Sequence, residues 1–112
     1  MGLVYAKVKM KNPRKPKLKP IEVEALVDSG AIITCIPESI AIELGLDEQE
    51  KRMAKTADGK VLKVPYVGPV QYYFDNRSCF GGAMVMGDQV LLGAVQMEDM
   101  DLIISPRDQK LS

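Results

Sequence analysis

The 112-residue sequence contains no histidine. This absence excludes Ser-His-Asp and Cys-His nucleophilic sites, histidine general bases and zinc sites with histidine ligands. If the chain is an enzyme without a cofactor, its acid–base chemistry must come from Asp, Glu, Lys, Tyr or Cys side chains. Carboxylates are therefore the first candidates, and we expect neither a cofactor nor a bound metal.

Cysteine is also scarce, because the chain has only Cys35 and Cys79. They lie 44 positions apart, a spacing that matches no metal-binding or redox motif. Unpaired cysteine is among the residues most often buried, so we expect two free thiols with at least one in the core. A disulfide would need an oxidising environment and suitable geometry.

Long apolar runs are absent, and none approaches the roughly 20 residues that a membrane-spanning helix needs. Residues 1–10 lack an uninterrupted apolar stretch and do not resemble a signal peptide. The length suits one domain with a modest core over residues 1–112. We therefore expect a soluble, cytoplasmic, single-domain protein with no membrane partner.

Net charge is zero, but residues 7–19 contain no acidic side chain. Such a segment could dock on nucleic acid or an anionic surface, or it could be the solvated tip of a hairpin. Its two prolines, a third proline directly after it at position 20 and the lack of aromatics beyond Tyr5 at its edge favour the hairpin tip, because single-strand binders stack bases on aromatic side chains. We expect no nucleic-acid partner. The basic residues of this segment are Lys7, Lys9, Lys11, Arg14, Lys15, Lys17 and Lys19.

Alternating apolar and polar residues predict two strands, at residues 4–11 and 21–27. The proline-containing stretch 12–16 separates them. The second strand ends in Asp28-Ser29-Gly30, and the apolar run 32–36 predicts a buried strand after it.

The rest of the chain also indicates a mainly β protein. Pro37 suits the first position of a short helix to Leu44, which Gly45 would stop. Asp58-Gly59 predicts a tight hairpin. We expect a closed or semi-closed β-barrel with one or two short helices. The remaining predicted elements are strands at 67–74 and 79–86 joined through 75–77, a strand at 90–92 ending at Gly93, a helix at 95–99 and a last strand at 101–104.

The main candidate for chemistry is the acidic residue at the end of the second strand. The apolar residues 25–27 lead to Asp28, and the turn pair Ser29-Gly30 follows. Two neighbouring carboxylates that share a proton provide one acid and one base at the same pH. Gly30 allows a tight turn, and the Ser29 hydroxyl could hydrogen-bond across it. Taken alone, Asp-Ser-Gly is also an ordinary turn sequence.

The context of this triplet resembles the retropepsin-like aspartic proteases, closer to bacterial and cellular members than to viral ones. Residues 22–37 resemble the family's active-site segment, with Asp28-Ser29-Gly30-Ala31 as its motif. Residues 52–66 fall where the family has its flap hairpin. Residues 90–93 match its second signature of two aliphatic residues and a glycine, and 101–104 match the strand after the following helix.

The resemblance implies an aspartic endopeptidase that acts on extended polypeptide. Only one Asp-Ser-Gly is present, so a homodimer would bring two copies of Asp28 together as the catalytic pair. The alternative is a non-catalytic peptide-binding or protein-binding module with the same fold. The implied supporting residues are Ser29, Gly30, Ala31, Leu92 and Gly93, and the implied substrate-binding flap residues are Thr56, Ala57, Asp58, Gly59 and Lys60.

The chain departs from the viral pattern at positions that bear on dimer strength. Ile32 and Ile33 replace acidic residues after the active-site motif, and Ala94 replaces a charged residue after the second-signature glycine. Because those charges help to tie the viral dimer, the resemblance leaves the strength of a dimer of this chain open.

Overall fold

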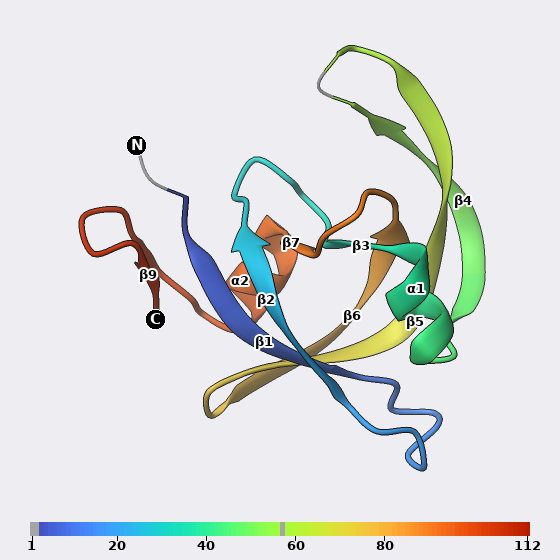
Figure 1. Cartoon of the computed structure of the whole chain (residues 1–112), viewed down its shortest axis with the longest axis horizontal. Helices are drawn as coiled ribbons and strands as arrows, with labels where there is room; N and C mark the ends of the chain where they lie inside the picture. The colour runs from blue at the N-terminus through green and yellow to red at the C-terminus, as the bar shows by residue number, and fades with distance from the viewer. Residues whose placement is uncertain (1–2, 57) are drawn as a thin grey trace.

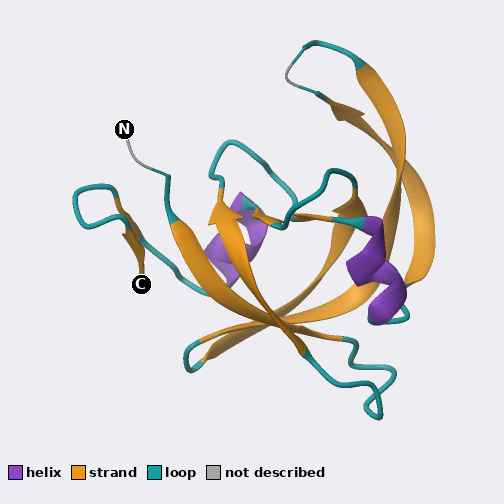
Figure 2. Ribbon diagram, in the orientation of Figure 1, coloured by secondary structure: helices purple, strands orange, loops and turns teal. Residues whose placement is uncertain are grey.

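A computed structural model describes residues 3–56 and 58–112 of the chain. Within them the protein is mainly β, with a seven-stranded sheet in the order β1-β2-β7-β3-β6-β5-β4 and a separate β8-β9 pair (Figures 1 and 2). Neither helix is long and apolar enough to cross a membrane. The elements are β1 (Tyr5–Lys11), β2 (Ile21–Val27), β3 (Cys35–Ile36), α1 (Glu38–Glu43), β4 (Asp47–Lys55), β5 (Val61–Phe74), β6 (Arg77–Val85), β7 (Leu91–Leu92), α2 (Ala94–Asp99), β8 (Ile104–Ser105) and β9 (Lys110–Leu111).

The first two strands form the predicted hairpin, and their alternation is confirmed. Ala6, Val8 and Met10 of β1 are buried, while the lysines between them are exposed. Lys7 and Lys9 lie opposite Glu24 and Glu22 of β2, so opposite charges face each other across the strands. Residues 12–20 form the loop between the strands, and most of its side chains are exposed, which confirms a hairpin tip for the second part of the basic segment. The alternative, docking through this segment, is not tested by the fold.

The long strand β5 connects the parts of the sheet, because it pairs with β4, β6 and also with β1. The first half of β5, residues 61–68, pairs with β4 to form a curved arm that projects from the body in Figure 1. The second half of β5 lies over the core, where Tyr72 is fully buried and its hydroxyl donates to the carbonyl of Gly82. The largest other fully buried apolar side chains are Met10, Ile36, Leu44, Leu92, Val8 and Val70.

The predicted buried strand at 32–36 is wrong in its first half. Only Cys35 and Ile36 form β3, and the Ile32 side chain is 72% exposed. Backbone carbonyls of Ala31 and Ile32 accept hydrogen bonds from the N-terminus of α2, so this segment is a loop tied to a helix. Hydrophobicity alone could not distinguish this from a buried strand.

The predicted last strand at 101–104 is wrong for residues 101–103, because only Ile104 lies in a strand, β8. Asp101 has a φ of 55°, and the N–H groups of Asp101 and Leu102 donate to carbonyls in the last turn of α2. These residues therefore end the helix. The last strands are instead β8 and β9, of which the sequence did not predict the second.

Smaller boundary differences have local causes. Pro37 has a ψ of 153° and precedes α1 as its N-cap, whereas we expected it inside the helix. Gly45 stops α1 as predicted, with a φ of +60° that glycine adopts without steric cost. Arg77 opens β6 opposite Phe74, so the turn contains only Asp75 and Asn76.

A buried asparagine joins the N-terminal hairpin to α1. The Asn12 side chain is 2% exposed, and its Nδ2 donates to the carbonyls of Leu44 (2.9 Å) and Gly45 (3.1 Å). Its Oδ1 accepts from the N–H of Arg14 at 2.9 Å. Asn12 thus satisfies two carbonyls at the C-terminal end of the helix and one amide of its own loop.

We predict that Asn12→Ala lowers the free energy of unfolding by about 1–3 kcal/mol, because the buried Leu44 carbonyl loses its side-chain donor, whereas the Gly45 carbonyl keeps that of Lys15. Urea denaturation followed by circular dichroism measures this. Lys17→Ala, in the same loop but exposed, should change stability by less than about 0.5 kcal/mol. Equal denaturation midpoints for the two variants would contradict the prediction.

Candidate active site

Asp28 follows the last residue of β2, where that strand lies beside β7. Its N–H donates to the carbonyl of Leu92 at 3.1 Å. Its Oδ1 accepts from the N–H of Gly30 at 3.0 Å, and its carbonyl accepts from the N–H of Ala31 at 3.1 Å. Asp28 is half-buried in the single chain, whereas Ser29 is exposed and its hydroxyl makes no hydrogen bond among the described residues. The turn is therefore held by backbone groups and the carboxylate itself.

The loop after Asp28 lies directly against the junction of β7 and α2. The N–H groups of Ala94 and Val95 donate to the carbonyls of Ala31 (2.8 Å) and Ile32 (3.0 Å). A Cβ on Gly93 would lie 2.5 Å from the carbonyl carbon of Ile33, a distance no side chain tolerates. The predicted supporting residues Ala31, Leu92 and Gly93 thus lie together, and glycine is required for this close approach.

A buried polar cluster on the same junction was missed by the sequence reasoning. Thr34 is fully buried, and both its hydroxyl (2.7 Å) and its N–H (3.1 Å) donate to Oε1 of Gln96. The Thr34 hydroxyl also accepts from the N–H of Gly93 at 3.0 Å. Thr34 is the one polar residue in the apolar run 32–36, and this was the available signal.

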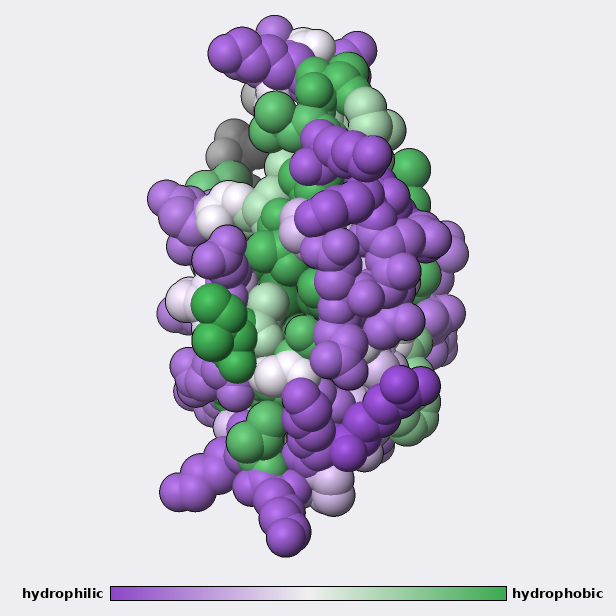
Figure 3. All heavy atoms as spheres, turned by 90° about the vertical axis from the view of Figure 1, so that its right-hand side faces the viewer, coloured by the Kyte–Doolittle hydropathy of each residue, from purple (hydrophilic) through white to green (hydrophobic). Residues whose placement is uncertain are grey.

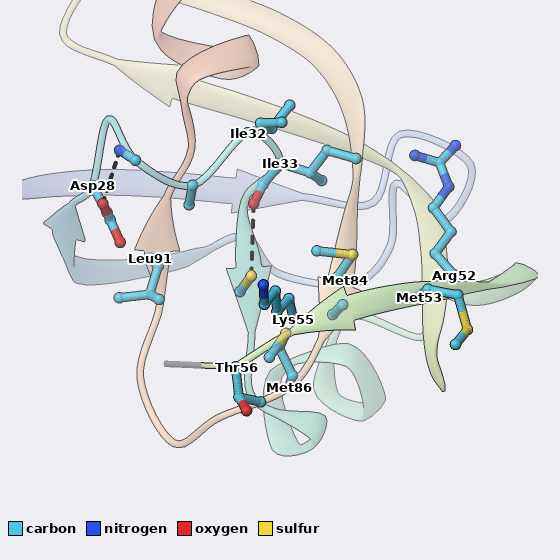
Figure 4. Close-up of a pocket in the computed structure, with 14 residues that line it drawn as sticks. Asp28, Ile32, Ile33, Arg52, Met53, Lys55, Thr56, Met84, Met86 and Leu91 are labelled. Atoms are coloured by element: carbon cyan, nitrogen blue, oxygen red, sulfur yellow. Dashed lines mark hydrogen bonds between the residues drawn. The ribbon is translucent and has the colours of Figure 1, made fainter. Parts of the chain in front are cut away.

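A cleft of about 910 Å³ lies between the Asp28 loop and the β4–β5 arm. In Figure 4, Asp28 lies at one end of this cleft and Arg52 at the other. Asp28 is the only carboxylate among the described residues that line it, and most of the rest are apolar. Figure 3 shows the face that carries β4, where a band of apolar atoms runs between hydrophilic side chains. The apolar lining residues are Ala31, Ile32, Ile33, Met53, Ala54, Met84, Met86 and Leu91.

The tip of the β4–β5 arm is a tight turn with its own hydrogen bonds. Gly59 has a φ of +88°, and its N–H donates to the carbonyl of Thr56 at 3.0 Å. The Thr56 hydroxyl donates to the Asp58 carboxylate, and this bond together with the N–H of Lys60 lowers the pKa of Asp58. Of the predicted flap residues, Thr56 lines the cleft, Asp58, Gly59 and Lys60 do not, and Ala57 lies outside the described residues.

Two cations accompany Asp28 on the cleft wall. The Arg52 guanidinium lies 3.8 Å from the ring centroid of Tyr66, and its Nε lies 2.7 Å from a carboxylate oxygen of Glu50. Lys55 forms no ion pair with any described residue. The described cleft lining therefore has one carboxylate, that of Asp28, and two cations, of which Arg52 is paired with Glu50 and Lys55 is in no ion pair.

Both cysteines are free and buried, as predicted. Cys35 lines the cleft near Asp28, and its thiol donates to the carbonyl of Ile33 at 3.6 Å. Burial raises the pKa of Cys35 above its ordinary value, and the charge of Asp28 raises it further. Burial likewise raises the pKa of Cys79 to about 11, with a smaller contribution from Asp99. Both thiols favour their neutral form, so neither is suited to be a nucleophile at neutral pH.

Residues 3–56 and 58–112 contain no group of three or more His, Cys, Asp or Glu side chains placed to hold one metal ion. Among the described residues that line the cleft, Asp28 is the one candidate for acid–base catalysis near neutral or acidic pH. One carboxylate can act as an acid or as a base, but it cannot do both in the same step.

Comparison with protein families identifies a family that matches this part of the chain. The model of the family described as "gag-polyprotein putative aspartyl protease" matches residues 18–73, half of the 112-residue chain. The matched range contains Asp28, its loop and the whole β4–β5 tip. No curated protein matches the chain.

We predict that Gly93→Ala destabilises the protein by about 1–3 kcal/mol or more, because its Cβ would overlap backbone atoms that cannot move aside cheaply. Thermal denaturation measures the change. Gly59→Ala is the control: its Cβ would meet nothing within 4 Å, so its cost is left-handed backbone strain of about 1 kcal/mol. A smaller loss for Gly93→Ala than for Gly59→Ala would refute the close approach.

We predict that Asp28→Asn speeds alkylation of Cys35. Removing the negative charge lowers the pKa of the thiol, so more thiolate is present at a given pH between 7 and 9. Iodoacetamide labelling followed by mass spectrometry gives the rate for each cysteine. Cys79 is the internal control, because the charge that raises its pKa belongs to Asp99. Equal acceleration at both cysteines would indicate general loosening and contradict the prediction.

Proposed function

This chain belongs to the gag-polyprotein aspartyl protease family, and from that premise we propose that it is an aspartic endopeptidase whose active form is a homodimer. Each copy contributes one Asp28 to a carboxylate pair on the two-fold axis. The proposal treats residues 1–112 as a single retropepsin-like domain. Its closed barrel is supported by the pairing of β1 with both β2 and β5.

The observation that carries the proposal is that Asp28 is the only carboxylate lining the cleft in the described part of the chain. Hydrolysis of a peptide bond needs a base to activate water and an acid to protonate the carbonyl oxygen. A second chain supplies the missing group. Ile32 supports the same conclusion, because an aliphatic side chain 72% exposed beside the turn is suited to be covered by a partner.

In the proposed mechanism the two Asp28 carboxylates share one proton. The ionised carboxylate takes a proton from a water molecule, which attacks the scissile carbonyl carbon, while the protonated one donates to the carbonyl oxygen. As the tetrahedral intermediate collapses, the carboxyl that took the proton from water gives it to the leaving amine, and the C–N bond breaks. The other carboxylate takes a proton from a hydroxyl of the intermediate, which restores the shared proton.

The substrate fits the cleft as an extended strand. The β4–β5 arm covers the cleft from one side and would close over the peptide, with Thr56 facing the substrate and residues 58–60 forming the tip. The lining of the cleft is mostly apolar and includes Ile33, Met84 and Leu91. We therefore propose apolar side chains next to the scissile bond.

Asp28→Asn should reduce cleavage of an unfolded protein substrate by roughly 10²–10⁴-fold, because it removes the acid–base group. A mixing experiment makes the test sharper. If hetero-dimers are inactive and subunits exchange freely, a 1:1 mixture of wild type and Asp28→Asn should retain about one quarter of the activity of the same total amount of wild type.

If each chain had a complete active site of its own, the same 1:1 mixture would retain about one half of the activity. Lys17→Ala in place of Asp28→Asn is the control and should leave full activity. Equal cleavage by wild type and Asp28→Asn would refute the proposal. A chain that stays monomeric in sedimentation and binds peptide without cutting it would instead be the non-catalytic binding module.

A further inference from the structure

The Asp28 loop is tied at both of its ends to one short segment of chain, residues 92–96. At its start, the N–H of Asp28 donates to the carbonyl of Leu92. At its end, Thr34 bonds to Gln96 and Gly93 through the buried polar cluster. Neither Thr34 nor Gln96 lines the cleft, so neither can touch a substrate there.

The hydrogen bonds of this cluster have a fixed direction. A hydroxyl has one proton, and that of Thr34 points to Gln96 Oε1 at 2.7 Å, so its oxygen must accept from the N–H of Gly93. Gln96 Oε1 accepts a second bond from the Thr34 N–H at 3.1 Å, which uses both of its lone pairs. The cluster therefore permits one relative placement of the loop and the helix.

Packing alone does not require these polar groups. Valine has nearly the shape of threonine and would fill the same space in the core without a hydroxyl to satisfy. Burying a hydroxyl and an amide costs free energy unless their partners are in place, and here every one of these bonds is made. Compared with an apolar contact, the cluster additionally fixes the orientation of the Asp28 loop relative to α2.

We propose that Thr34 and Gln96 are positioning residues that set the direction of the Asp28 carboxylate. The proposal rests on the proposed function, in which two copies of Asp28 must meet at hydrogen-bonding distance. Productive geometry of this kind has to be held within about 0.5 Å, and an error of about 1 Å can cost 10²-fold in rate. Without the cluster, the loop would keep its backbone bonds from Ala31 and Ile32 to α2 and from the Thr34 carbonyl to the N–H of Met84, but no side-chain bond would join Thr34 to α2.

The test compares Thr34→Val, which removes only the hydroxyl, with Thr34→Ser, which keeps it. Gln96→Met removes the acceptor at similar length. Val8→Ala is the control for lost stability, because Val8 is fully buried in β1 and takes no part in the hydrogen bonds of the cluster. All variants are assayed at concentrations where sedimentation shows the same fraction of dimer.

We expect Thr34→Val and Gln96→Met to lower kcat by at least about tenfold with KM within about twofold of wild type, since the groups act on geometry and not on binding. Thr34→Ser should restore kcat to within about threefold, and Val8→Ala should leave kcat unchanged although its melting temperature falls. Equal loss in Thr34→Val and Thr34→Ser, or a similar loss in Val8→Ala, would overturn the proposal.

Amide hydrogen exchange separates this inference from the proposed function, because it needs no cleavage. The N–H groups of Gly30 and Ala31, bonded to Asp28, report directly on the turn. We expect faster exchange at both in Thr34→Val and Gln96→Met but not in Thr34→Ser or Val8→Ala. If exchange at these two amides is unchanged in Thr34→Val, the positioning role is refuted whether or not the protein is a protease.

Discussion

The contact between Gly93 and the backbone of Ile33 and Thr34 is the constraint on which the candidate site depends. A Cβ at position 93 would lie 2.5 Å and 2.6 Å from those backbone atoms. Only this close approach allows the first N–H groups of α2 to reach the carbonyls of the Asp28 loop. The orphan donors of the helix and the orphan acceptors of the loop are thereby satisfied together.

In the proposed dimer, the site built on this contact supplies one half of the catalytic carboxylate pair. Asp28 is presented with its backbone held and one carboxylate oxygen bonded, and no second carboxylate lines the cleft in the described residues. The exposed Ile32 beside it and the projecting β4–β5 arm leave apolar surface that the single chain does not cover. In the proposed dimer the viral charges absent at positions 32, 33 and 94 would be replaced by apolar contact, which depends less on salt.

Much of the fold could be predicted from local patterns. Alternation at residues 4–11 and 21–27, the Asp58-Gly59 turn and the Gly45 stop each follow from rules that act within a few residues, and the structure contains all four. The predicted strands at 32–36 and 101–104 were wrong in their first parts, because those parts form hydrogen bonds with α2 that override their apolar composition. The local sequence did not indicate that Met84 and Met86 belong to the cleft wall.

The sequence by itself determined most of the element types, the absence of histidine chemistry and the acidic residue at the end of a strand. These depend on side-chain identity and on spacing within one element. The tertiary structure decided that Thr34 meets Gln96 across 62 positions, that Asn12 caps a helix 32 positions away, and that Asp28 shares a cleft with Cys35 and the β4–β5 arm. Such pairings arise from how strands and helices pack, and no local pattern records which distant residue will satisfy a buried polar group.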